Sequence, residues 1–484
     1  MRTKNYKRQI LLFCALPAIL SATSYSWAEV TIEPKVQLQA IFTDNVELTG
    51  TDTEGDLIFA ATPGLTIGID RNRARGSIDY NLSGFFSTHD TSRSEIRHRL
   101  NGFVEGDVVR DLFSIRVDGS VGQQFADVSG PISANTGNFT SNRRTVQGYS
   151  VTPRLYHEFG SFGQGELAYT FGYSRFENDN DNPNSLSLFD SRRHRARASF
   201  DSGSRFTRLS WGLSGFYDRV KRGNGNEFEA VEGKLALAYA LGRKIKLVSD
   251  LGYEDFEDAT LGRDEDGFIW NAGINVTPSR RSEFEFRAGE RFGDLVFSGN
   301  ALYRIDSRHT ISGNYSEDIQ VFGRGNIDRI GLIEAILRGI PVDENGVPVS
   351  AGSPGFELTN FAFRQKRASL SVSRSSRFFQ TTLTGFWERR RFAAEPDARI
   401  SYGGSINLGY TIDSKQTANI GGTYRNSDLT NGSTNEFFSL STSYDVRLTE
   451  VLTGSARYVY SRRLGSSGIN LSENAVILTI GAAF

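Results

Sequence analysis

Alternation of polar and apolar residues recurs along most of the chain, and it constrains the fold more than any other feature. In residues 73–86 the even positions are apolar or glycine, from Ala74 onward, and the odd positions are polar up to Ser83. The same alternation returns at 208–218 and 399–410. Successive side chains of a β-strand point to opposite faces, so these segments are predicted to be strands with one apolar and one polar face. Soluble β-sandwiches and transmembrane barrels both show this pattern.

The connections between the alternating segments favour a barrel. Very short turns (70–72, 242–243, 278–280, 413–414) alternate with longer polar connections (124–145, 178–191, 323–360). Outer-membrane barrels have this asymmetry, with tight periplasmic turns and long outer loops. We therefore predict an all-β fold, a transmembrane up-and-down antiparallel β-barrel of about 22 strands. An even number of strands returns both termini to the periplasm.

The first 28 residues have the pattern of an export signal. Basic residues precede an apolar stretch at 10–20, and Ser26-Trp27-Ala28 is a small-x-small cleavage site. We expect cleavage after Ala28, which leaves 29–484 as one barrel domain with no plug domain ahead of it. The expected location is the outer membrane of a Gram-negative bacterium.

Composition excludes several classes of function. The only cysteine, Cys14, lies in the signal, so the mature chain has no disulfide and no thiol site. The five histidines have no ligand spacing, and the sequence from Asp179 onward lacks the glycine and glutamate of an EF-hand loop. Solvated charge is the better interpretation of this acidic loop and of the one around Asp264. We therefore expect no metal, no cofactor and no catalytic residues. A net charge of −1 and export from the cytoplasm argue against a nucleic-acid partner.

Aromatic residues and the C-terminus indicate contacts with the envelope. The tryptophans of the mature chain (Trp211, Trp270, Trp387) lie at apolar positions of the alternating segments. This placement is typical of the aromatic girdles of a barrel, which contact outer-membrane lipid and lipopolysaccharide. The last strand ends on Phe484, which resembles the signal that the barrel assembly machinery recognises. An ordinary closing strand is the alternative.

Many arginines and acidic residues occupy the polar positions of the alternating segments, which are predicted to face the lumen. Arg193, Arg195 and Arg197 are the best candidates for an uncompensated basic patch in the lumen, because like charges at i and i+2 repel unless something offsets them. Carboxylates on neighbouring strands would make the wall self-neutralising, whereas an anionic solute would make it a selectivity surface.

The longest connection contains a predicted helix at 327–338, followed by a turn at 343–346. One stripe of this helix is apolar (Ile330, Ile333, Ile336, Leu337). An apolar stripe needs a surface to bury against. We expect this outer loop to form a constriction or a cap, with an outer-surface contact as the alternative.

Several short segments, in this order, carry a resemblance to a family: Thr43-Asp44-Asn45-Val46, Thr62-Pro63-Gly64, Asp79-Tyr80, His98-Arg99-Leu100 and Pro153-Arg154-Leu155-Tyr156-His157-Glu158-Phe159-Gly160. Together they resemble the exosortase (PEP-CTERM) system-associated outer-membrane β-barrel proteins, which are related to the β-barrel porins of type 2. The resemblance covers most of the mature chain. It implies a role in outer-membrane passage of exopolysaccharide, with polysaccharide export components as partners, and it supplies no catalytic residues.

The expected function is a pore or export component for a hydrophilic, anionic or saccharide solute. Two alternatives stay open. One is a structural or surface-binding barrel with a closed lumen. The other is a barrel-embedded hydrolase, which the scarcity of histidines disfavours.

Overall fold

The structure is a computed structural model, and it describes residues 25–27, 30–125, 130–177, 189–258, 265–291, 293–320, 362–392, 395, 397–428, 433–465 and 470–484. The first half of the sheet contains β1 (Tyr25–Trp27), β2 (Val30–Thr43), β3 (Asp56–Arg71), β4 (Ala74–Ser87), β5 (Glu95–Val109), β6 (Phe113–Phe125), β7 (Arg143–Glu158), β8 (Gly163–Phe176), β9 (Ser191–Ser202), β10 (Leu209–Arg222), β11 (Glu227–Ala240) and β12 (Ile245–Asp258). The 3-10 helix η3 (Thr91–Arg93) precedes β5.

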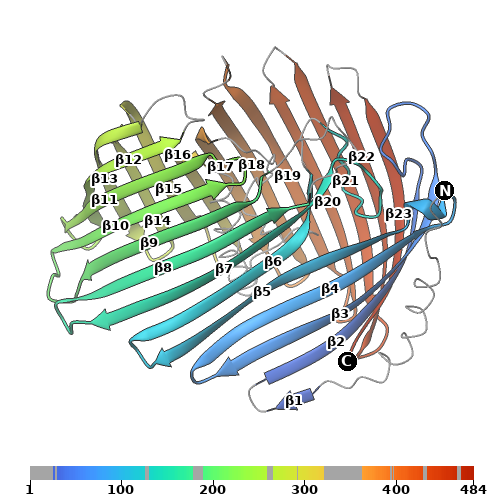
Figure 1. The fold of residues 1–484 in the computed structure, drawn as a ribbon, viewed down its shortest axis with the longest axis horizontal. Coiled ribbons are helices and arrows are strands. Elements are labelled where there is room, and N and C mark those ends of the chain that lie inside the picture. The colour runs from blue at the N-terminus through green and yellow to red at the C-terminus, as the bar shows by residue number, and fades with distance from the viewer. Residues whose placement is uncertain are drawn as a thin grey trace.

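The second half contains β13 (Glu265–Ser279), β14 (Ser282–Arg291), β15 (Asp294–Arg304), β16 (His309–Gln320), β17 (Phe363–Ser375), β18 (Phe379–Phe392), β19 (Arg399–Thr411), β20 (Gln416–Asp428), β21 (Thr434–Arg447), β22 (Leu452–Gly465) and β23 (Leu471–Ala483). Each strand pairs antiparallel with the next along the chain (Figure 1). The predicted up-and-down topology is therefore confirmed.

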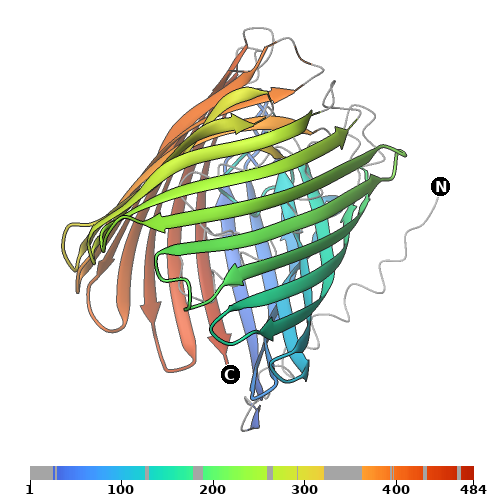
Figure 2. The same cartoon turned by 90° about the vertical axis from the view of Figure 1, so that its left-hand side faces the viewer.

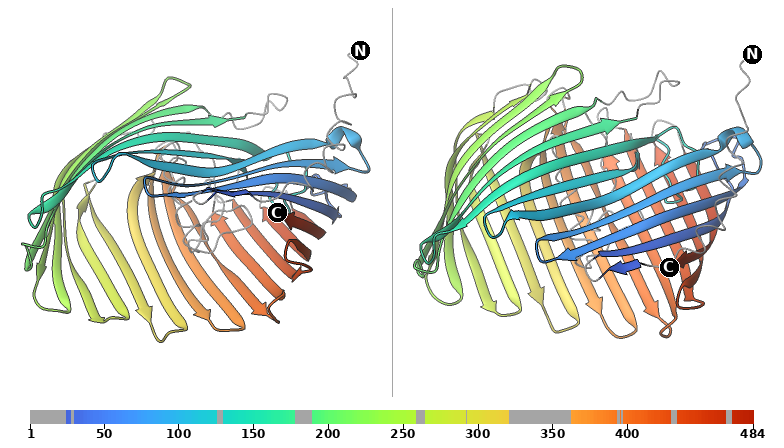
Figure 3. Two further views of the ribbon diagram at one scale, coloured as in Figure 1. Left: turned by 90° about the horizontal axis from the view of Figure 1, so that it is seen from below. Right: turned by 60° about the horizontal axis from the view of Figure 1, so that its bottom comes forward.

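The pairing of β2 with β23 closes the sheet into a barrel. Its register runs from Lys35 opposite Ala483 to Thr43 opposite Ala475. Figure 3 shows the strands coloured blue to green on one side of the ring and those coloured yellow to red on the other. The barrel proper is β2 to β23, which confirms the prediction of 22 strands. β1 pairs only with the first residues of β2, and it belongs to the segment that we expect to be removed.

Connection length differs between the two rims. The C-terminal end lies at the lower rim in Figure 2, the rim where β3 joins β4 through residues 72–73 and β11 joins β12 through 241–244. Connections of more than ten residues (44–55, 126–142, 177–190, 321–362) all join strand ends at the opposite rim. We call this second rim the outer rim, because outer-membrane barrels carry their long loops outside the cell.

The two faces of the wall differ in polarity. In β18 Leu383 and Trp387 are exposed on the outside, whereas Thr384, Glu388 and Arg390 alternate with them and are buried on the inside. The exposed tryptophans Trp270 and Trp387 lie on the outer face, as predicted. A polar lumen behind an apolar outer surface is the arrangement of a barrel in lipid. Among the described residues, no helix is long and apolar enough to span a membrane.

Candidate functional site on the inner face of the barrel

The three arginines of the predicted basic patch lie on the inner face of β9. The Arg193 guanidinium donates to both carboxylate oxygens of Asp218, at 2.8 Å (Nε–Oδ1) and 2.6 Å (Nη2–Oδ2), and both side chains are almost fully buried. Arg197 forms an ion pair with Glu166, and Arg195 lies 4.9 Å above the ring of Phe216. Carboxylates of neighbouring strands offset Arg193 and Arg197, which corrects the expectation of an uncompensated patch at these two positions.

The inner face of β11 to β16 is rich in carboxylates, and Arg291 is shared by three of them. Its guanidinium lies 2.8 Å from Glu254, 3.4 Å from Asp318 and 3.7 Å from Glu232. Further carboxylates on the same inner arc are Asp250, Asp258, Glu283 and Glu285. Arg287 pairs with Asp250 and Glu285, Lys234 with Glu232, and Arg222 of β10 with Asp258. Because the carboxylates of this arc outnumber these cations, this part of the wall has an excess of negative charge.

The inner face of β17 to β22 has the opposite composition. Arginines outnumber carboxylates among its described residues: Arg367, Arg390, Arg399, Arg425, Arg457 and Arg463 against Glu388, Glu395 and Asp445. We call this surface the basic wall.

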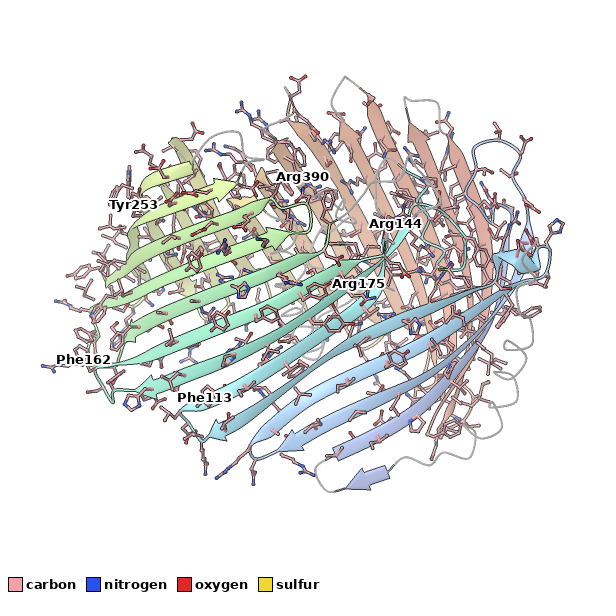
Figure 4. All side chains as sticks on the ribbon, in the orientation of Figure 1. Phe113, Arg144, Phe162, Arg175, Tyr253 and Arg390 are labelled. Atoms are coloured by element: carbon pink, nitrogen blue, oxygen red, sulfur yellow. The ribbon has the colours of Figure 1, made fainter. Side chains whose placement is uncertain are left out.

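Neutral partners hold several guanidiniums of the basic wall in place. Arg425 donates to Ser427 at 2.9 Å (Nε–Oγ), and Arg463 donates to Asn435 at 2.8 Å (Nε–Oδ1). Figure 4 shows Arg390 towards the same end of the strands as Arg144 and Arg175, whereas Phe113 and Phe162 lie at the other end. Neutral hydroxyl and amide groups therefore help to orient Arg425 and Arg463. Arg390 and Arg399 form ion pairs with Glu388 and Glu395.

Residues 130–142, between β6 and β7, fold onto the inner face of the barrel. We call them the inner segment. Its anchor is Glu473 of β23, whose buried carboxylate accepts hydrogen bonds from Ser133, from Asn135 at 2.7 Å and from Asn138 at 3.5 Å. A fourth bond comes from Thr43 of β2 at 2.7 Å. None of the described basic residues forms an ion pair with Glu473, so neutral donors alone solvate this carboxylate.

The inner segment also has apolar and backbone contacts with the wall. Phe139 and Ala134 pack against a buried apolar cluster that includes Ile41. The Phe139 N–H donates to the Val46 carbonyl at 2.9 Å, and Arg97 donates to the Asn138 carbonyl at 2.8 Å. The inner segment therefore narrows the lumen beside β2, β5, β22 and β23.

Sequence reasoning treated this connection only as a long polar loop and missed its role. The signal that could have found it is Phe139, the one aromatic residue of the sequence 126–142. The predicted constriction helix (Ile330, Ile333, Ile336, Leu337) and the predicted cleavage residue Ala28 lie outside the described residues. Phe484 is described, and its backbone N–H donates to the Pro34 carbonyl at 2.9 Å across the barrel seam.

Aromatic residues form a girdle near the short-turn rim. Phe162 packs edge-on against Trp211 with ring centroids 6.2 Å apart, and Phe200 stacks on Trp211 at 5.6 Å. Aromatic rings of this kind mark the membrane interface. A closed antiparallel barrel with an apolar outer face and such a girdle is an outer-membrane protein of a Gram-negative bacterium.

No family model matches the sequence, and no curated protein matches it either. Solved structures do match. One is a point mutant of the ferric enterobactin receptor of Pseudomonas aeruginosa in complex with enterobactin, at 10% identity and TM-score 0.53, over 96% of this chain and 82% of that one. Another is FpvA of P. aeruginosa bound to a heterologous pyoverdine, at 10% identity and TM-score 0.51, over 94% and 72%. At this identity the likeness establishes the barrel fold alone.

Proposed function

We propose that this outer-membrane barrel conducts or helps export a hydrophilic, anionic solute such as an exopolysaccharide. The observation that carries the proposal is the basic wall, where arginines outnumber carboxylates over β17 to β22. Guanidinium groups bind carboxylate and phosphate groups in fork geometry, and a surface rich in them selects anions over cations. The resemblance to exosortase-associated barrels supports a polysaccharide as the solute.

Ion selectivity in planar bilayers tests the proposal. In a salt gradient the wild-type barrel should prefer anions, and an anionic oligosaccharide should reduce its current. Replacing Arg367 and Arg457 of the basic wall with glutamine should shift the reversal potential towards cation preference. The matched control is Arg219→Gln on the outward face of β10, which should leave selectivity unchanged.

A closed, structural barrel is the second candidate. The inner segment favours it, because this segment occupies part of the lumen through buried hydrogen bonds to Glu473. A barrel that inserts into bilayers without any conductance, even after the inner segment is released, would support this candidate and contradict the proposed passage. The similarity to the siderophore receptors concerns the fold, so it does not indicate that this chain binds siderophores.

A further inference from the structure

Four cations face outward at the outer rim of β17 and β18. Lys366 lies directly opposite Arg389, and Arg364 lies directly opposite Arg391. They share the parity of Leu370 and Trp387, which are exposed on the outer face, so they point away from the lumen. We call these four residues the outer cationic cluster.

The position of Trp387 gives the depth of this cluster. Trp387 lies opposite Tyr402 of β19, and both rings are exposed on the outer face. Tryptophan and tyrosine on a barrel exterior lie at the level where acyl chains meet head groups. Arg389 and Arg391 follow on the same face, about 7 and 13 Å further along the strand. The cluster is therefore at the height of the phosphate groups of the outer leaflet.

The charges of the cluster are only partly neutralised. Like charges on directly opposite strand positions are destabilising. Arg364 forms an ion pair with Asp294 at 2.8 Å, and Lys366 forms one with Glu317 at 2.7 Å. Arg389 and Arg391 are exposed, and neither forms a hydrogen bond or an ion pair with the residues that the structure describes.

The outward rim of β10 and β11 differs. There Arg219 and Lys221 share the carboxylate of Glu227, at 3.0 Å from Arg219 Nε and 3.0 Å from the Lys221 ammonium. These two cations lie on the same face and near the same rim, but two acids of the neighbouring strand offset them: Glu227 lies opposite Lys221, and Glu229 lies opposite Arg219. Arg389 and Arg391 therefore differ from Arg219 and Lys221 in having no carboxylate partner among the described residues.

We propose that the outer cationic cluster binds the phosphorylated head group of an outer-leaflet lipid of the lipid A type. Arg389 and Arg391 contact its phosphate oxygens with their guanidinium forks, and Trp387 packs along the first part of an acyl chain. A phosphate dianion offsets the repulsion between the facing cations. The cluster should therefore bind a phosphorylated lipid more tightly than the same lipid without phosphate. This inference concerns the exterior of the barrel and does not depend on the proposed passage of a solute.

The test measures binding of fluorescent lipid A to the purified full-length barrel in a zwitterionic detergent. Bis-phosphorylated lipid A is compared with the same lipid after removal of its phosphates, and inorganic phosphate is added as competitor. The double variant R389Q/R391Q should bind bis-phosphorylated lipid A about tenfold or more weakly than wild type, because each basic residue near a charged membrane surface contributes to the affinity. The affinity of wild type should also fall as salt rises.

The matched control is R219Q/K221Q, which removes two outward cations that already have a partner, and it should retain the wild-type affinity. Heat-modifiability on gels verifies that each variant is a folded barrel. If R389Q/R391Q did not fold, Arg391→Gln alone would be measured, with a smaller loss of affinity expected. Equal binding of both lipids, equal binding by the folded variant and wild type, or complete displacement by inorganic phosphate at the lipid's own concentration would each overturn the proposal.

Discussion

Arg193 of β9 and Asp218 of β10 form a buried, two-bond ion pair across neighbouring strands of the inner wall. Breaking one side of such a pair leaves a buried charge without its counter-ion. We expect Asp218→Asn to lower the free energy of unfolding by about 3–5 kcal/mol. Urea unfolding in detergent, followed as loss of the heat-modifiable form on gels, measures this change.

The exposed pair Arg197–Glu166 is the control for that experiment. Half of the Arg197 side chain is exposed, at 48%, so solvent screens its charge. Glu166→Gln should therefore cost at most about 1 kcal/mol. Equal losses for Asp218→Asn and Glu166→Gln would mean that burial does not set the contribution of these pairs.

Asp306, in the exposed turn between β15 and β16, carries a pH-dependent contact. The His309 imidazole and the backbone N–H groups of Arg308 and His309 lower the pKa of Asp306 to about 2. A lowered pKa means that the ionised form stabilises the turn above the ordinary aspartate pKa, and that this contribution is lost as pH falls through about 2. His309→Gln should raise the pKa of Asp306 towards its usual value. The carboxyl chemical shift of labelled aspartate measures it, and an unchanged titration would contradict the assignment.

Much of the barrel could be predicted from the sequence, because the two-residue period of a strand depends only on local geometry. The alternation from Ala74 to Phe86 determines which side of the wall each residue occupies, and consecutive strands pair through short turns such as 241–244. An even strand number makes the closing pair β2–β23 antiparallel, as the other pairs are.

The interior of the barrel could not be predicted in the same way. The bond between Ser133 and Glu473 joins residues 340 positions apart, so no local pattern indicates it. Cross-strand partners are a similar case. Parity placed Arg193 and Asp218 on the inner face, but only the register puts Asp218 beside Arg193 and Arg195.

Phe484 provides a test of barrel assembly. Its backbone N–H donates a hydrogen bond to the Pro34 carbonyl across the seam where β23 meets β2. By the alternation of the strand, its position falls on the same outer face as the exposed residues Leu478 and Ile480. Deleting Phe484 should reduce assembly into the outer membrane and increase periplasmic proteolysis, while export across the inner membrane continues. Cell fractionation and protease sensitivity measure this. Normal assembly of the shortened chain would show that Phe484 is only a strand residue.

The outer loop that contains Ile330 and Leu337 gives a separate prediction about the lumen. Removing 323–355 should leave a folded barrel, since surface loops tolerate deletion and the strands keep their own pairing. If this loop closes the lumen, its removal should raise single-channel conductance and sensitivity to large antibiotics. Unchanged conductance and permeability would place the loop outside the lumen.

Release of the inner segment tests whether Glu473 maintains a constriction. The Glu473 carboxylate accepts hydrogen bonds from three residues of the segment, and the two shorter ones, from Ser133 and Asn135, contribute about 1.5–3 kcal/mol each. Glu473→Ala removes all of these acceptors and should allow the segment to leave the wall. Single-channel conductance should rise, and a cysteine introduced at Thr136 should become more reactive to hydrophilic reagents.

The control for this variant is Glu290→Ala, which removes an exposed carboxylate from the outward face of β14. It changes the same net charge without touching the lumen, so conductance should stay at the wild-type level. If Glu473→Ala and wild type conduct equally while the cysteine at 136 becomes reactive, the segment moves without controlling passage. If reactivity is also unchanged, the contacts of Phe139 and Arg97 with the wall are sufficient to hold the segment, and Glu473 is not its anchor.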